Sequence, residues 1–234
     1  MRLLALDTAT DWCSVALWQD GEITSRECRA ERGHGGQVLA MIDALLAEAG
    51  VTLTALDAVA FGRGPGAFTG LRLAASVTQG LAFAAGLPVI PVSDLRALAQ
   101  QLLLPPNDQA RVLVCHDARM GEVYWAGYHS LSGCARADTP EYVAAPADMI
   151  ESATAWIGTG AAYGAGSGFA AYPALSVLQA RLGPVRADIH PRAREIALLA
   201  ARDGLQIAVP PEQALPVYVR DNVAVPPGTA GPRV

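Results

Sequence analysis

A glycine-rich stretch near residue 65 contains the residue types from which proteins build phosphate-binding loops. It reads Gly62-Arg63-Gly64-Pro65-Gly66-Ala67-Phe68-Thr69-Gly70-Leu71-Arg72. An apolar run precedes it and an Ala/Leu-rich segment follows, an order that aims backbone N–H groups and a helix dipole at an anion. It is not G-x-x-x-x-G-K-S/T, because all 17 Lys+Arg residues are Arg, and it does not fit G-x-G-x-x-G. Two hypotheses follow: a phosphate loop of another kind, or a tight turn that lets helices approach.

Two aspartates, Asp7 and Asp117, each end an apolar run and are candidates for contact with a nucleotide. Each carboxylate either binds Mg²⁺ through water or accepts a hydrogen bond within its own turn. Thr8-Ala9-Thr10 lacks the glycine that would let a phosphate approach closely, which favours the turn for Asp7. For Asp117 both alternatives stay open. A second glycine stretch either cradles an adenine nucleotide or is a plain connection, so the weak nucleotide-binding set is Asp7, Asp117, Gly158 and Gly160.

The histidines and cysteines do not predict a metal or nucleophile site. His34 is four residues before Val38, so it has no metal-binding partner on a helix and is interpreted as a structural or interface histidine. Cys115 and His116 resemble a nucleophile and its base, but adjacent side chains on a strand point to opposite faces. The absence of lysine excludes Schiff-base chemistry. Two further histidines have no partner at a useful spacing: His129 and His190.

The composition indicates a folded protein with a substantial core. The chain has 234 residues, of which 52% are hydrophobic and 17% charged. A net charge of -5 argues against a large nonspecific nucleic-acid surface. The four cysteines form no C-x-x-C pair, and no leader or membrane-spanning run is evident. We therefore expect reduced thiols, no membrane association and a cytoplasmic location.

The elements that would position these residues form two similar series. The first has strands at 2–8, 12–19 and 22–29, a helix at 37–49, a strand at 56–61, a helix at 69–85, a strand at 89–92 and a helix capped by Ser93 that runs to about 103. After a linker at 105–108, the second has strands at 111–117 and 122–128, a third from about 133, a helix from 146, a strand at 153–157, a helix at 191–202 and a tail strand at 216–219.

Two copies of a βββαβα unit, each with an aspartate at the end of its first strand, predict an α/β fold of two lobes. This plan resembles that of actin, Hsp70 chaperones and sugar kinases, in which nucleotide phosphates lie between the lobes. We predict an N-terminal lobe with partner-binding helices at 1–104, a C-terminal lobe at 105–225 and a disordered tail at 226–234.

The helices at 37–49 and 69–85 are the predicted partner-binding surface. The first has a broad apolar arc, and the second has small residues at i, i+4 and i+8 that allow close approach of a neighbour. Helix–sheet packing explains such a stripe as well, but two adjacent helices of this kind favour an interface. The predicted contact residues are Val38, Met41, Ile42, Leu45, Phe68, Leu71, Arg72, Ala74, Ala75 and Thr78.

Several motifs taken together resemble the bacterial TsaB family, also called YeaZ. The resemblance runs in order from residue 1 to about 225, and its most specific parts are the loop at 62–72 and the hairpin Asp117-Ala118-Arg119-Met120-Gly121-Glu122-Val123-Tyr124. The other parts are Leu6-Asp7-Thr8-Ala9-Thr10, Gln79-Gly80-Leu81-Ala82, Gly158-Thr159-Gly160 and Pro216-Val217-Tyr218-Val219-Arg220.

The resemblance implies a catalytically degenerate relative of TsaD, the subunit that places threonylcarbamoyl on the adenosine beside the anticodon of tRNA. Such a protein pairs with TsaD, helps to recruit the ATPase TsaE, self-associates through its N-terminal helices and meets tRNA indirectly. No tightly bound cofactor is expected, and ATP or ADP would bind only at a partner interface.

TsaD-type proteins hold a metal with H-x-x-x-H, a spacing that places two imidazoles on one helix face. The corresponding positions here are Asp94 and Leu98, so we predict no metal and no catalytic residue. The alternative is an active ATP-dependent phosphotransferase or acyltransferase of the same fold. The missing histidine pair disfavours a metallopeptidase.

Overall fold

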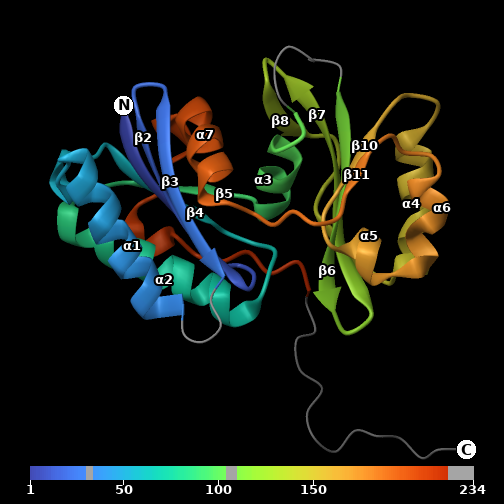
Figure 1. Cartoon of the computed structure of the whole chain (residues 1–234), viewed down its shortest axis with the longest axis horizontal. Helices are drawn as coiled ribbons and strands as arrows, with labels where there is room; N and C mark the ends of the chain where they lie inside the picture. Colours follow the sequence, from blue (N-terminus) through green and yellow to red (C-terminus); the bar gives the residue numbers. More distant parts are fainter. Residues whose placement is uncertain (30–33, 104–109, 221–234) are drawn as a thin grey trace, which may run out of the picture.

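The computed structural model describes residues 1–29, 34–103 and 110–220, which form two lobes side by side, each built on one mixed sheet (Figure 1). In the first sheet β1 pairs antiparallel with β2 and parallel with β4. Strand β3 extends the antiparallel side, and β5 extends the parallel side. The sheet order is β3 (Glu22–Arg29), β2 (Trp12–Gln19), β1 (Arg2–Asp7), β4 (Ala58–Gly62) and β5 (Val89–Val92).

The second sheet repeats this arrangement. Its central strand β6 pairs antiparallel with β7 and parallel with β10, and β9 (Tyr142–Ala144) also pairs with β7. The duplicated βββαβα plan and the two-lobed α/β fold predicted from the sequence are therefore confirmed. The sheet order is β11 (Val185–Arg186), β10 (Tyr163–Ala165), β6 (Arg111–Arg119), β7 (Glu122–Leu131) and β8 (Cys134–Ala137).

Helices from both halves of the chain cover the first sheet. On one face, α1 (His34–Ala49) and α2 (Phe68–Ala85) lie side by side. On the other face lies α7 (Ala193–Asp203), whose Ile196 and Leu199 pack with Leu3 and other buried residues of the first sheet. The sequence-based boundary places this helix in the C-terminal lobe, and the structure differs because its apolar side completes the core of the first lobe.

The opposite exchange occurs with α3 (Asp94–Gln100), which follows the first sheet in the chain. Its Leu95 and Leu98 pack with Val112 and Tyr128 of the second sheet. Each lobe thus receives a helix from the other half of the sequence, and this exchange ties the two lobes together. The outer face of the second sheet is covered by α4 (Pro146–Ile157), α5 (Gly168–Ala171) and α6 (Ser176–Gln179).

Two strand predictions in the second half are wrong. Residues 153–157 form the end of α4, in which Met149, Ala153 and Ile157 are buried at the four-residue spacing of a helix face. Residues 216–219 join no sheet, and the N–H of Val217 donates to the carbonyl oxygen of Arg63 instead. Short apolar runs suit a strand and a buried helix end equally well, because only tertiary contacts separate the two.

The remaining connections are short turns and 3₁₀ segments, namely η1 (Leu53–Ala55), η2 (Pro173–Leu175), η3 (Leu205–Ile207) and η4 (Pro211–Gln213). The predicted linker at 105–108 and the predicted tail at 226–234 lie outside the described residues. Within the described part of the chain, we find no helix with the length and apolar character needed to span a bilayer.

Candidate functional site

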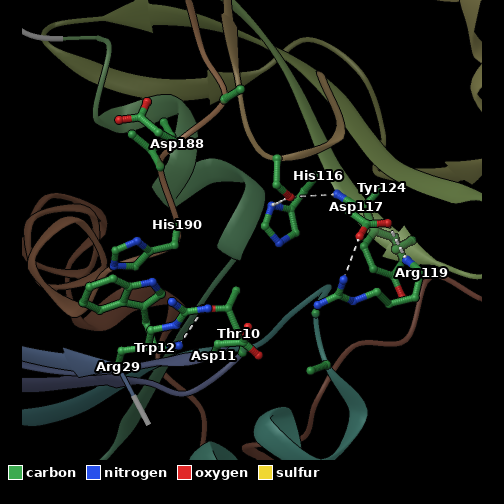
Figure 2. Close-up of a pocket in the computed structure, with 17 residues that line it drawn as sticks. Thr10, Asp11, Trp12, Arg29, His116, Asp117, Arg119, Tyr124, Asp188 and His190 are labelled. Carbon is green, nitrogen blue, oxygen red and sulfur yellow. Dashed lines mark hydrogen bonds and ion pairs between the residues drawn. The ribbon is translucent and has the colours of Figure 1, made fainter. Parts of the chain in front are cut away.

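A cavity of about 280 Å³ lies between the lobes (Figure 2). The first lobe contributes the turn after β1 and the start of the α2 connection, and the second contributes the end of β6 and two loops. Its polar lining combines cationic, anionic and imidazole groups. The side chains with ionisable or aromatic groups are Asp11, Trp12, Arg29, His116, Asp117, Arg119, Tyr124, Asp188 and His190.

Asp117 lines this cavity from the end of β6, and its carboxylate is held by its own hairpin. Its Oδ1 accepts hydrogen bonds from the N–H of Arg119 and the hydroxyl of Tyr172, each at 2.8 Å. Its Oδ2 lies 3.1 Å from the Arg119 guanidinium. These bonds form the Asx-type turn that was one of the two alternatives for this residue.

His116 belongs to a short hydrogen-bond chain beside Asp117. The N–H of Asp117 donates to the Ser167 hydroxyl at 3.1 Å, and that oxygen lies 3.1 Å from Nδ1 of His116. The Ser167 hydroxyl therefore bridges the backbone of Asp117 and the imidazole ring of His116. Burial lowers the pKa of His116 to about 4, although the charge of Asp117 acts in the opposite direction.

We expect His116 to stay neutral down to pH 5. Its folded pKa lies below that of an unfolded histidine, so its contribution to stability is complete above about pH 6.5 and is lost as the pH falls toward 4. Ring proton shifts measured by NMR between pH 8 and 5 should stay constant for His116. A midpoint near 6.5 would contradict the half-buried, hydrogen-bonded position of this ring.

Cys115 and His116 lie on opposite faces of β6, as the sequence predicts. The sulfur of Cys115 contacts the sulfur of Met149 in the core at 3.8 Å, whereas His116 faces the cavity. The two other histidines do have partners, so that expectation was wrong. His129 pairs with Asp138 at 2.6 Å, and His190 stacks on Trp12 with ring centroids 4.3 Å apart. Strand pairing and loop folding bring these partners together, which sequence spacing does not reveal.

The structure does not bring the four predicted nucleotide-binding residues together. Asp7 is fully buried beneath the cavity, and its Oδ1 accepts a hydrogen bond from the N–H of Ala9 at 3.3 Å. Gly158 and Gly160 follow α4, and Gly160 lies beside Arg111, at the opposite end of β6 from Asp117. Among the described residues, no three His, Cys, Asp or Glu side chains are grouped to hold a metal ion.

The glycine loop contacts its own chain at the positions where a phosphate would need space. A Cβ built on Gly70 would overlap the carbonyl oxygen of Thr8, and one on Gly66 would lie 2.8 Å from Cβ of Ala9. Gly64 has a φ of +105° and lies under the carbonyl of Val217. This geometry favours the tight-turn hypothesis over the phosphate loop.

A second cavity of about 280 Å³ adjoins the first and has mainly apolar walls. It lies between the start of α2, the β6–β7 hairpin and the segment 217–220. The guanidinium of Arg72 stacks on Phe68 at 3.8 Å and donates to the Tyr218 hydroxyl at 3.1 Å. Arg220 reaches the second lobe, where it pairs with Glu122. The segment 217–220 therefore bridges both lobes.

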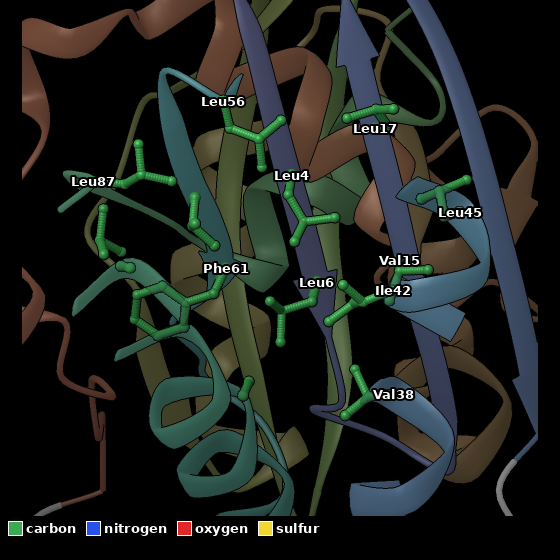
Figure 3. Packing of buried hydrophobic residues seen from close by; sticks show 14 of the residues in the cluster. Leu4, Leu6, Val15, Leu17, Val38, Ile42, Leu45, Leu56, Phe61 and Leu87 are labelled. Carbon is green, nitrogen blue, oxygen red and sulfur yellow. The ribbon is translucent and has the colours of Figure 1, made fainter. Parts of the chain in front are cut away.

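Most of the predicted partner-binding residues face the protein's own core. Figure 3 shows Val38, Ile42 and Leu45 of α1 packed against the first sheet. Leu71, Ala74, Ala75 and Thr78 are buried on α2, and Met41 is partly buried. Of the ten, Phe68 and Arg72 are exposed. The small-residue stripe serves helix–sheet packing, which the sequence could not distinguish from an interface.

The outward faces of the two helices carry different residues. On α1 they include Leu39, Ala40, Asp43, Ala47 and Glu48, and on α2 they include Ser76, Gly80, Phe83 and Ala84. Leu39 and Phe83 are 47% and 81% exposed. On α1 the charged residues Asp43 and Glu48 are a sequence signal for the outward side, whereas on α2 apolar and small residues lie on every side.

The chain matches known proteins over most of its length. A family model described as TsaD, tRNA N6-adenosine threonylcarbamoyltransferase, matches residues 28–226. An Escherichia coli (strain K12) protein, "tRNA threonylcarbamoyladenosine biosynthesis protein TsaB", is 41% identical over 231 residues, which are 96% of each chain. The chain belongs to the TsaB family. The family protein of Haemophilus influenzae is 51% identical over 126 residues, which cover 54% of this chain and 53% of that protein.

Solved structures agree with this assignment. "YeaZ from Pseudomonas aeruginosa" has a TM-score of 0.80 at 42% identity and covers 93% of this chain and 99% of its own. A structure from the same organism, described as an uncharacterized protein with similarity to peptidase YEAZ, has a TM-score of 0.82 at 41% identity, with 94% and 99% covered. The resemblance inferred from the motifs is therefore confirmed, and the TsaB relatives are named for threonylcarbamoyladenosine biosynthesis in tRNA.

Proposed function

We propose that this protein is a non-catalytic subunit of the complex that adds threonylcarbamoyl to adenosine next to the tRNA anticodon. It docks on the catalytic relative TsaD through the outward faces of α1 and α2. The observation that carries the proposal is the pair of adjacent helices whose outer faces expose the apolar side chains Leu39 and Phe83 among several small residues. An exposed patch of this kind is typical of an interface and costs solubility where nothing covers it.

The middle of α2 supports close approach of another helix. A Cβ built on Gly80 would meet no described atom within 4 Å, so the glycine faces open space. A glycine in the interior of an 18-residue helix lowers helix stability by about 1 kcal/mol relative to alanine. Because neither a turn nor internal packing requires glycine here, contact with a partner backbone accounts for it.

Replacement of Gly80 by arginine tests the proposal without disturbing the fold. We expect the Gly80→Arg variant to be at least as stable as the wild type, because the new side chain enters solvent and the helix gains propensity. Its affinity for TsaD should fall at least 100-fold, because the arginine would prevent the helices from meeting. Titration calorimetry and tRNA modification by the reconstituted proteins measure the two effects.

The matched control is Ala155→Arg, at an exposed position of α4 on the other lobe. This variant should bind TsaD and support modification as the wild type does. Wild-type affinity and modification in the Gly80→Arg variant would show that the α1–α2 face is not the docking surface. Leu71 and Ala74 of the same helix are unsuitable for such a test, because both are buried in the core.

The remaining parts of the proposal concern ligands and further partners. The complex recruits the ATPase TsaE, the same helix face supports a self-dimer in the absence of TsaD, and tRNA is met through the partners. Any ATP or ADP binds where a partner completes a site, and the chain itself holds no tightly bound cofactor or metal. The protein acts in the cytoplasm, where tRNA is modified.

A further inference from the structure

Two carboxyl groups meet inside the first lobe, beneath the cavity between the lobes. Asp7 ends β1 and Asp94 begins α3, and both are fully buried. A Cβ built on Gly62 would overlap Oδ2 of Asp7 and Oδ1 of Asp94 together. The two oxygens therefore occupy the same space beside one glycine.

The other carboxyl oxygens hold the loops on either side. Oδ1 of Asp7 accepts from the N–H of Ala9, in the turn that precedes β2. Oδ2 of Asp94 accepts from the N–H of Gly64, and the N–H of Asp94 donates to the carbonyl oxygen of Gly64 at 3.0 Å. Both backbone groups of Gly64 are thus bound to one residue of α3.

We propose that Asp7 and Asp94 form a buried acid–carboxylate pair that retains one proton at neutral pH and thereby fastens the glycine loop to β1 and α3. Two like charges that share a solvent-free site cannot both ionise at ordinary pH, so one carboxyl keeps its proton and donates it to the other. A hydrogen bond between an acid and a carboxylate is among the stronger kinds, because one partner is charged.

The groups around Asp7 and Asp94 do little to stabilise a second negative charge on the pair. The groups that act on the charges of the pair are the thiol of Cys13 from β2, beside Asp7, and Glu141 of the second lobe. Arg63 of the glycine loop is 3.4 Å from Glu141 and pairs with it. Burial, the charge of Asp7 and the bond to Asp7 raise the pKa of Asp94 well above its ordinary value, against the lowering effect of the Gly64 amide.

The proton couples pH to the position of α2. The glycine loop leads directly into this helix, and the N–H of Val217 in the bridging segment donates to Arg63 of the loop at 2.7 Å. The folded protein binds the proton more tightly than the unfolded chain does. Its contribution to stability is therefore complete below about pH 4, the pKa of an unfolded aspartate, and is lost as the pH rises through the raised pKa.

Replacing either aspartate by asparagine removes the titratable group and keeps the size and shape of the side chain. In Asp94→Asn, the amide nitrogen donates to Asp7 permanently while the amide oxygen accepts from Gly64, and Asp7→Asn is the converse variant. We compare urea unfolding of the wild type and both variants between pH 5 and 9. Relative to either variant, the unfolding constant of the wild type should rise by up to tenfold per pH unit until the proton is lost.

A second measurement on the wild type does not depend on variant folding. Infrared difference spectra at pH 7 should show a protonated carboxyl band that is absent from both variants. The control is Asp148→Asn, at an exposed position of α4, which should retain the band and the pH dependence of the wild type. The proposal is overturned when the wild type shows no protonated carboxyl at pH 7, or when Asp94→Asn and Asp7→Asn keep the wild-type pH dependence.

Discussion

Replacement of Gly70 by alanine should lower the free energy of unfolding by about 3 kcal/mol or more. The added methyl group would overlap the carbonyl oxygen of Thr8, a backbone atom that cannot rotate away. The Thr8 hydroxyl also donates to the Gly70 carbonyl at 2.7 Å, and this buried bond would be displaced. The start of α2 and the β1–β2 turn would therefore have to separate. Urea denaturation of the isolated protein measures the change.

The same substitution at Gly80 provides the control on the same helix. Gly80 faces open space, so alanine adds helix propensity without a clash and should raise stability by up to about 1 kcal/mol. A stability loss for Gly70→Ala together with a stability gain for Gly80→Ala would distinguish the effect of close packing from that of backbone entropy. Equal effects at Gly70 and Gly80 would contradict the close approach of α2 to the Thr8 turn.

Replacement of Arg96 by alanine should lower the free energy of unfolding by about 3 kcal/mol, because it leaves a buried carboxylate poorly paired. Both terminal nitrogens of Arg96 bind Asp203, whose side chain is 5% exposed, and its Nε donates to the carbonyl of Ala135 at 2.7 Å. Arg96 thus links α3, α7 and β8. Arg136, at 3.2 Å, would remain as the partner of Asp203 but is 44% exposed.

Thermal unfolding checks this prediction, with an expected fall in Tm of about 6–12 °C for a chain of this size. The matched control is Arg186→Ala, which removes an exposed ion pair with Asp188 at 2.9 Å and should change stability by less than about 1 kcal/mol. A loss for Arg96→Ala no larger than that for Arg186→Ala would show that the bridge does not join the lobes.

Local patterns in the sequence were sufficient for most elements. Alternating and apolar runs predicted β1, β2 and β3 within one residue, because strand pairing across short turns depends on neighbouring residues. Ser93 caps α3 as expected, accepting from the N–H of Arg96 at 3.1 Å. The similarity of the two halves then predicted the second sheet, and the motif at 62–72 predicted the family.

The candidate site was only partly predictable. Asp117 lines the cavity between the lobes, and its predicted contact with a nucleotide stays a prediction. Asp7, its counterpart, is buried instead, because the glycine loop and α3 close over it. The outward face of α2 was missed because apolar and small residues surround this helix, so its periodicity does not say which side meets the sheet.

The sequence by itself determined most of the elements, their duplication and the family, since each depends on residues close together in the chain or on a recognisable motif. Tertiary structure alone decided that α3 and α7 exchange lobes, that Gly66 and Gly70 pack against the turn of Thr8 and Ala9, and that Asp7 meets Asp94. These features join segments far apart in the chain. Their physical basis is close packing and the exclusion of water, which no local pattern of residues records.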